Sequence, residues 1–126
     1  MKVHPGITRL IRVMLMVFLL VHLMSCFWYL VAKYEDFSDE SWVKQNDVFD
    51  ESITYKYLYS MYWTFQTLTT VGYGDVVIIT VPERLVALMW IVFGVIFYSF
   101  TIGSLQSIIK SLDHNTQEHQ MKQNTL

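Results

Sequence analysis

Residues 69–75 read Thr69-Thr70-Val71-Gly72-Tyr73-Gly74-Asp75, and this heptapeptide decides how the rest of the sequence is interpreted. Its two glycines alternate with larger residues, and glycine adopts backbone conformations that side-chain-bearing residues avoid. Successive carbonyl oxygens can then point to one side instead of alternating as they do in a strand. Such a row of carbonyls can replace the hydration shell of a cation. Because one chain contributes one oxygen per layer, several copies have to surround an axis.

An uncharged segment rich in aromatic residues and threonine precedes the heptapeptide. Residues 57–69 read YLYSMYWTFQTLT, which is too short to span a bilayer but suits a buried or re-entrant helix. Non-helical backbone at membrane depth is tolerated only where it lines a cavity filled with water or ions. The sequence therefore predicts a short helix over 57–69 that delivers the heptapeptide to such a cavity.

Two long apolar runs flank this region. Residues 13–32 form a run of 20 and residues 85–109 a run of 25, and neither contains a formal charge. A helix of 20 residues spans about 30 Å, the thickness of the hydrocarbon core of a bilayer. We therefore expect an all-α membrane protein with an outer helix at about residues 9–32 and an inner helix at about 84–112.

The basic residues before the first run allow two interpretations. Lys2, Arg9 and Arg12 resemble the basic region of a signal peptide, which would make the chain a secreted protein. The run is longer than a signal peptide needs, however, and Leu30 lies where a cleavage site requires a small residue, so we favour a retained helix. The same basic residues favour a cytoplasmic N-terminus, and two spans then place both termini in the cytoplasm.

Composition excludes several classes of protein. Apolar residues make up 53% of the chain and charged residues only 16%, and the net charge of −2 argues against binding to nucleic acid. The single cysteine, Cys26, excludes an intrachain disulfide framework. No histidine–carboxylate–nucleophile pattern suggests an enzyme, and no motif suggests a cofactor. His114 and His119 lie in a polar tail at 113–126.

The segment at 33–56 is strongly acidic. Seven aspartates and glutamates occur there against three lysines, which predicts a solvated loop, or turret, on the outer side of the membrane.

The heptapeptide TTVGYGD resembles the selectivity filter of potassium channels, and the order of outer helix, turret, pore helix, filter and inner helix agrees with that family. The resemblance implies passive conduction of K⁺ through a homotetramer in a lipid bilayer, with residues 70–74 as the filter. It implies no cofactor other than the permeant ion. A non-conducting structural subunit that keeps the pore fold remains an alternative.

The resemblance also assigns roles to individual residues. Four filter residues are expected to bind K⁺ through their carbonyls: Thr70, Val71, Gly72 and Tyr73. The Thr70 hydroxyl is expected to be a further ligand, and Gly74 completes the filter. Five residues are expected to support the filter: Tyr62, Trp63, Gln66, Thr69 and Asp75. The Tyr73 ring is expected to point away from the axis and to pack against aromatic residues of the pore helix, Trp63 especially. Asp75 is expected to accept a hydrogen bond from Tyr62.

Five residues of the inner helix are expected to form the inner pore and gate. Tyr98, Ile102 and Gln106 recur at every fourth position and share one face, which we expect to line the inner pore. Gly94 and Gly103 interrupt the apolar run, and Gly94 is either a bending point for gating or a site of close helix packing.

Residues 9–113 resemble more specifically the superfamily of ether-à-go-go, hyperpolarisation-activated, cyclic-nucleotide-gated and plant inward-rectifier channels. The stretches SWVKQND, HLMSCFWYL and YSFTIGSLQSIIKSLD carry this resemblance. It implies voltage-sensor and cyclic-nucleotide-binding-like domains as further partners, so the chain is expected to be a pore-only channel or the pore module of a larger one. The plasma membrane is the expected location. His22 and Cys26 are expected to be structural, with His22 in a hydrogen bond between helices.

The acidic turret leads to a first prediction. Negative charge outside the pore raises the local concentration of cations, an effect that salt screens over about 10 Å at 0.1 M. Neutralising Asp39, Glu40, Asp50 and Glu51 together should therefore lower inward current at low ionic strength and have little effect at high salt. Bilayer recordings at both salt concentrations test this, and equal inward currents at low salt would show that the turret points away from the pore mouth.

Overall fold

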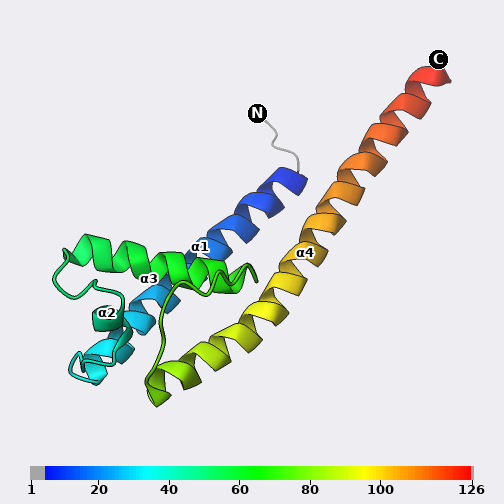
Figure 1. The fold of residues 1–126 in the computed structure, drawn as a ribbon. Coiled ribbons are helices and arrows are strands. Elements are labelled where there is room, and N and C mark those ends of the chain that lie inside the picture. Colours follow the sequence, from blue (N-terminus) through cyan, green and yellow to red (C-terminus); the bar gives the residue numbers. More distant parts are fainter. Residues whose placement is uncertain (1–4, 126) are drawn as a thin grey trace.

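The computed structural model describes residues 5–125, and this part of the chain contains four helices and no strand. In chain order they are α1 (Pro5–Tyr34), α2 (Trp42–Gln45), α3 (Ile53–Leu68) and α4 (Val81–Asn124). α1, α3 and α4 contact one another pairwise, and α1 begins on the same side of the molecule as α4 ends (Figure 1). Lys2 and Leu126, which belong to the predicted basic N-terminus and polar tail, lie outside the described residues.

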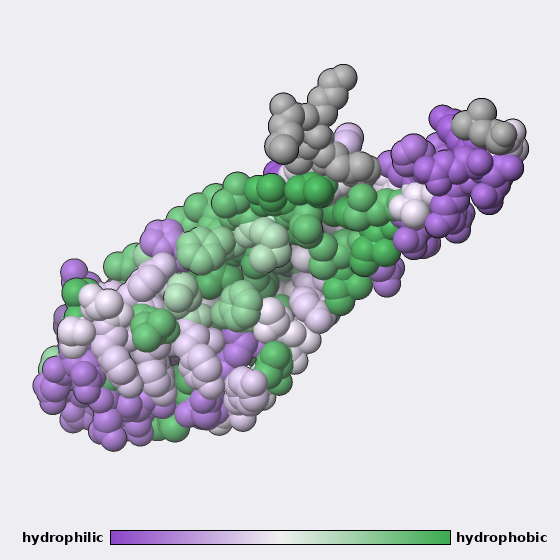
Figure 2. All heavy atoms as spheres, turned by 90° about the horizontal axis from the view of Figure 1, so that it is seen from above, coloured by the Kyte–Doolittle hydropathy of each residue, from purple (hydrophilic) through white to green (hydrophobic). Residues whose placement is uncertain are grey.

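Two of these helices are long and apolar enough to cross a membrane. They are α1, with 30 residues, and α4, with 44 residues, and they confirm the predicted all-α class with two candidate spans. Figure 2 shows a broad apolar band across the middle of the molecule, with hydrophilic surface at both ends. Large exposed apolar side chains, including Leu88, Ile91, Val95 and Ile96, occur along one side of α4, whereas Ala87, Trp90 and Gly94 are buried on the side that packs on α1 and α3. A helix that is apolar on all sides needs lipid or protein around it.

The inner helix is longer than the sequence predicted. At 1.5 Å per residue, the 44 residues of α4 extend about 66 Å, roughly twice the hydrocarbon thickness. The helix continues through the predicted polar tail to Asn124, because neither glycine nor proline follows Leu112 in the described part of the chain. One pair on this extension, His114 Nδ1 and Glu118 Oε1 at 3.6 Å, has the i,i+4 spacing that supports a helix.

The other boundaries differ by smaller amounts. α1 begins four residues before the predicted start and ends two residues after the predicted end. α3 begins at Ile53 instead of residue 57, where the Ser52 side chain caps the helix by accepting a hydrogen bond from Tyr55 N at 3.2 Å.

The turret is not the uniformly solvated loop that its charge predicted. Trp42, Val43 and Val48 are 0%, 0% and 1% exposed, and the first two lie in the short helix α2. These apolar side chains fold inward between the charged positions, because burying them removes apolar surface from water. The turret therefore has a small core of its own that joins the core of the helices.

One tryptophan from each helix contributes to that core: Trp28, Trp42, Trp63 and Trp90. Trp28 stacks on Trp63 with ring centroids 4.0 Å apart and on Trp42 at 5.9 Å. The indole N–H groups of Trp42 and Trp90 donate to the carbonyls of Trp28 and Thr64, both at 3.2 Å. Flat rings that both stack and hydrogen-bond fix the distance and the orientation of α3 relative to α1 and α4.

Gly94 lies where α4 meets the end of α3. A Cβ atom added there would lie 3.4 Å from Leu68 Cα and 3.5 Å from Thr67 O, which an alanine fills without displacement. We predict that Gly94→Ala leaves thermal stability almost unchanged, whereas Gly94→Leu destabilises by about 1–3 kcal/mol through overpacking. Thermal unfolding in detergent measures both, and a stable leucine variant would contradict the close approach of the two helices.

Candidate functional site

The segment after α3 turns back sharply, and its backbone N–H groups hydrogen-bond to Gln66. The Val71 and Gly72 N–H groups donate to Gln66 O at 2.9 and 3.3 Å, and Tyr73 N–H donates to Gln66 Oε1 at 2.9 Å. Gln66 is only 5% exposed, so the acceptor of each of these bonds belongs to a buried residue. Three consecutive backbone amides are thereby directed toward a single residue of α3.

This arrangement determines where the carbonyls point. In a trans peptide the N–H of one residue is antiparallel to the C=O of the preceding one, and no cis peptide occurs in the described residues. The carbonyls of Thr70, Val71 and Gly72 therefore point away from Gln66, to the open side of the segment. Positive φ at alternate residues accompanies this, with +62° at Thr70, +59° at Gly72 and +72° at Gly74.

The Gln66 side chain also holds the next carboxylate. Its Nε2 donates to Asp75 Oδ1 at 3.0 Å, while Tyr62 donates its hydroxyl to Asp75 Oδ2 at 2.7 Å. The second bond is the one that the sequence predicted. Thr69, another predicted support residue, caps α3 instead by donating its hydroxyl to Phe65 O at 2.9 Å.

These bonds shift the pKa values of both partners. The hydrogen bond from Tyr62, followed by that from Gln66, lowers the pKa of Asp75 below its usual value of 3.8, because both bonds stabilise the charged carboxylate. Donation to the same carboxylate is the main reason that the pKa of Tyr62 is raised from 10.0 to about 12. Asp75 is thus held as an anion just beyond the segment at 70–74.

The expected contact between Tyr73 and Trp63 is absent within the chain. Trp63 is 6% exposed and stacks on Trp28, whereas Tyr73 is 70% exposed. Trp63 belongs instead to the aromatic core, where it stacks on Trp28. Tyr73 is left projecting from the molecule.

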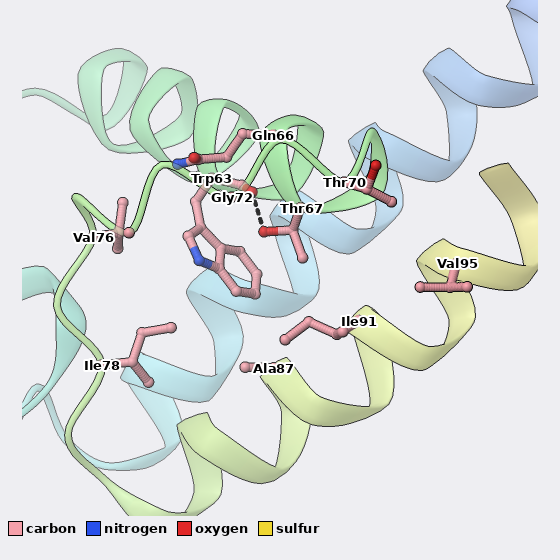
Figure 3. Close-up of a pocket in the computed structure, with 11 residues that line it drawn as sticks. Trp63, Gln66, Thr67, Thr70, Gly72, Val76, Ile78, Ala87, Ile91 and Val95 are labelled. Carbon is pink, nitrogen blue, oxygen red and sulfur yellow. Dashed lines mark hydrogen bonds between the residues drawn. The ribbon is translucent and has the colours of Figure 1, made fainter.

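A cavity of about 390 Å³ lies between α3, the returning segment and α4 (Figure 3). Its wall combines residues of α3, of the segment that follows and of α4: Trp63, Gln66, Thr67, Thr70, Gly72, Gly74, Val76, Ile78, Ala87, Ile91 and Val95. Most of these side chains are apolar and none carries a formal charge. The cavity is therefore a poor site for a charged ligand, and the polar feature of this region is the backbone itself.

The inner-helix residues predicted from the sequence do not form one site within the chain. Gly94 is buried against the end of α3, which favours the packing interpretation over a bend, and α4 is continuous through it. A Cβ atom added at Gly103 would have no neighbour within 4 Å. Tyr98, Ile102 and Gln106 are exposed along α4.

The sequence matches the family model described as "Ion transport protein" over residues 2–117. The chain belongs to the ion transport protein family. It is 32% identical over 91 residues to potassium channel AKT1 of Arabidopsis thaliana, which covers 71% of this chain and 11% of that protein. It is 27% identical over 121 residues to the human cyclic nucleotide-gated channel alpha-3, covering 94% of this chain and 17% of that protein.

A third relative in this family is human potassium/sodium hyperpolarization-activated cyclic nucleotide-gated channel 4. The identity is 26% over 117 residues, covering 93% of this chain and 10% of that protein. These relatives confirm the resemblance inferred from the sequence, and all three are named as channels and not as enzymes. The chain spans between about a tenth and a sixth of their lengths.

Two further predictions concerned the ionisable residues within α1. His22 Nδ1 lies 2.6 Å from the Tyr57 hydroxyl on α3, so the expected hydrogen bond between helices is present. Cys26 Sγ lies 4.0 Å from His22 Nε2. Within residues 5–125, no three histidine, cysteine, aspartate or glutamate side chains gather as a metal site would require.

Sequence reasoning missed Asn46 and Glu83 as partners of distant backbone. Asn46 hydrogen-bonds Val77, 31 residues away, and Glu83 accepts from Trp42 N at 2.7 Å. The sequence shows Glu83 as an acid at the start of a helix. It does not show that Trp42 N–H is its partner, because no local pattern indicates that α2 lies close to the start of α4. Asn46 carried no signal beyond its place in the SWVKQND stretch.

The Tyr62–Asp75 hydrogen bond makes stability depend on pH at both extremes. Asp75 has a lowered pKa in the folded state, so its stabilisation is complete above the ordinary value of 3.8 and is lost as the pH falls through the lowered pKa. Tyr62 has a raised pKa, so its contribution is complete below pH 10.0 and is lost as the pH rises through about 12.

Tyr62→Phe should flatten both limbs of this pH profile, since the folded and unfolded pKa values of Asp75 then approach each other. Thermal unfolding midpoints in detergent across the pH range provide the measurement. Tyr34→Phe is a matched control, because Tyr34 is 86% exposed. An unchanged profile in Tyr62→Phe would show that the bond contributes nothing to stability.

Proposed function

We propose that this chain forms the pore of a potassium-selective channel, in which four copies surround an axis and K⁺ moves passively down its gradient. The observation that carries the proposal is the row of three consecutive carbonyls, from Thr70 to Gly72, turned to one side by Gln66. Stacked carbonyl rings that replace the hydration shell of the ion are how potassium filters work. The relatives named as potassium channels support the choice of ion.

The filter in this proposal comprises residues 70–74. The Thr70 hydroxyl and the Tyr73 carbonyl add K⁺ ligands at the two ends of the row. α3 ends at Leu68, beside the filter, so the negative end of its dipole favours a cation there. Tyr62, Gln66 and Asp75 hold the outer end of the filter through the hydrogen bonds described above.

The rest of the chain supplies the membrane span and the inner pore. α1 and α4 cross the bilayer of the plasma membrane, with both termini in the cytoplasm. Tyr98, Ile102 and Gln106 line the inner pore, and Gly103 is left as the glycine available for bending because Gly94 packs on α3. Voltage-sensing and cyclic-nucleotide-binding-like domains, where present, lie outside these 126 residues.

The test is electrical. Purified tetrameric protein in a planar bilayer, with K⁺ on one side and Na⁺ on the other, should give a current whose reversal potential is far from zero and has the sign set by K⁺ permeation. A tetramer that passes no current would favour the non-conducting structural subunit, and a reversal potential near zero would show a channel without selectivity for K⁺.

Gly72→Ala tests the filter directly. Gly72 has φ of +59° and no atom within 4 Å of an added Cβ, so the variant is disfavoured by backbone strain and not by a clash. A non-glycine residue in this region costs about 1–2 kcal/mol, which favours rotation of the peptide and loss of the carbonyl row. We expect selective conduction to disappear in bilayer recordings, whereas Gly103→Ala should keep its K⁺ selectivity; a selective Gly72→Ala channel would contradict the proposed site.

A further inference from the structure

The segment that follows the filter lacks backbone pairing of its own. Among the described residues, no hydrogen bond between backbone groups involves residues 73–79. Unpaired backbone of this kind has to be held by side chains or water. Two side chains hold it here: Gln66 binds Tyr73 N–H, and Asn46 binds Val77.

Asn46 binds Val77 with both ends of its amide. Its Oδ1 accepts from Val77 N–H at 3.0 Å, and its Nδ2 donates to Val77 O at 3.1 Å. This pair of bonds resembles the two N–H···O hydrogen bonds that paired residues of antiparallel strands form with each other. It fixes both the position and the rotation of the Val77 peptide groups. Val77 lies only two residues beyond Asp75, so Asn46 is the first backbone anchor after the filter.

Asn46 is itself held rigidly. It closes α2, where its N–H donates to Trp42 O at 3.1 Å and its Nδ2 also reaches that carbonyl at 2.7 Å. Trp42 is fully buried, stacked between Trp28 at 5.9 Å and Tyr59 at 6.0 Å. The end of α2 that carries Asn46 is therefore fixed to the aromatic core and not to a mobile loop.

The other end of α2 is bound to the inner helix. Trp42 N–H donates to Glu83 Oε1 at 2.7 Å, and Glu83 is 0% exposed in the first turn of α4. Thr80 caps that turn by accepting from Glu83 N at 3.3 Å. α2 is thus a short bridge from the first turn of α4 to the peptide groups of Val77.

We propose that Asn46 is a positioning residue for the outer end of the filter, held in place by α2, which Glu83 anchors to the inner helix. The inference rests on the proposed function, and it assigns to the turret a second task besides its charge. Gln66 positions the filter from the side of α3, and Asn46 positions the chain leaving the filter from the side of the turret. Loss of Asn46 lets residues 74–77 move, and the carbonyl row then loses its spacing.

The experiment compares Asn46→Leu with wild type in the full purified chain. Leucine has nearly the same size but can form neither bond to Val77. Two quantities are measured: hydrogen exchange at the Val77 and Tyr73 amides, and the K⁺/Na⁺ permeability ratio in bilayers. We expect exchange at Val77 to accelerate up to about tenfold, the order expected for losing one hydrogen bond, and the permeability ratio to fall.

Two further variants separate positioning from general damage. Gln45→Leu is the matched control, because Gln45 lies next to Asn46 on the turret and its side chain donates to Asp39 O, at 2.8 Å, and not to Val77. It should match wild type in both quantities. Asn46→Asp keeps an acceptor for Val77 N–H but loses the Nδ2 donor to Val77 O and Trp42 O, so exchange at Val77 should lie between that of wild type and that of Asn46→Leu. Asn46→Ala also loses both bonds to Val77, and it takes the place of Asn46→Leu if the leucine protein does not fold.

The outcomes distinguish this inference from the proposed function. If wild type conducts K⁺ selectively and Asn46→Leu has the same Val77 exchange and the same permeability ratio, the inference is wrong and the proposed function stands. The inference is equally wrong if Asn46→Leu folds and alters Val77 exchange and the permeability ratio no more than Gln45→Leu does. If wild type passes no selective current, the proposed function fails, and exchange at Val77 still decides whether Asn46 positions this segment.

Discussion

The hydrogen bonds from three consecutive backbone N–H groups to Gln66 are the constraint on which the rest of the structure depends. Unpaired amides need partners, and Val71, Gly72 and Tyr73 find them in the backbone and side-chain carbonyls of one buried residue. Since peptide groups are planar and trans, directing the amides inward directs the carbonyls outward. The amide of Gln66 cannot be reversed, because Tyr73 N–H needs an acceptor and the Asp75 carboxylate needs a donor.

These hydrogen bonds form only if α3 keeps a fixed position and rotation relative to α1 and α4. The four tryptophans hold α3 in that position. The Trp28–Trp63 stack fixes α3 against α1, and the bond from Trp90 to Thr64 O fixes it against α4. Gly94 allows α4 to approach the end of α3 closely. Rings resist shear better than flexible aliphatic side chains do, because their stacking and hydrogen bonds prefer one geometry. A rigid support suits a site whose ligands are backbone atoms.

The sequence predicted the features that depend on local pattern and missed those that depend on distant partners. Apolar runs predicted two long helices, and the family pattern predicted the Tyr62–Asp75 bond. The many acidic residues of the turret led to the prediction of a solvated loop, so the burial of Trp42, Val43 and Val48 was missed. Their burial depends on the core that contains Trp28. The predicted inner helix ended too early because the prediction took polarity as the end of the helix, whereas the tail lacks glycine and proline and contains good helix formers such as glutamine, glutamate and lysine. Asn46 could be paired with Val77 only in three dimensions.

The surface of the single chain shows why the proposed site needs further copies. Val71 is 53% exposed and Tyr73 is 70% exposed, and α4 also carries large exposed apolar side chains on the side that does not pack on α1 and α3. One chain offers a cation only one oxygen in each layer, whereas a dehydrated ion requires a ring of them. Among residues 5–125, the segment at 70–74 remains exposed on the side to which its carbonyls point. The chain thus builds a precise support on one side of residues 70–77 and leaves the other side open, which suits a site completed by identical chains around an axis.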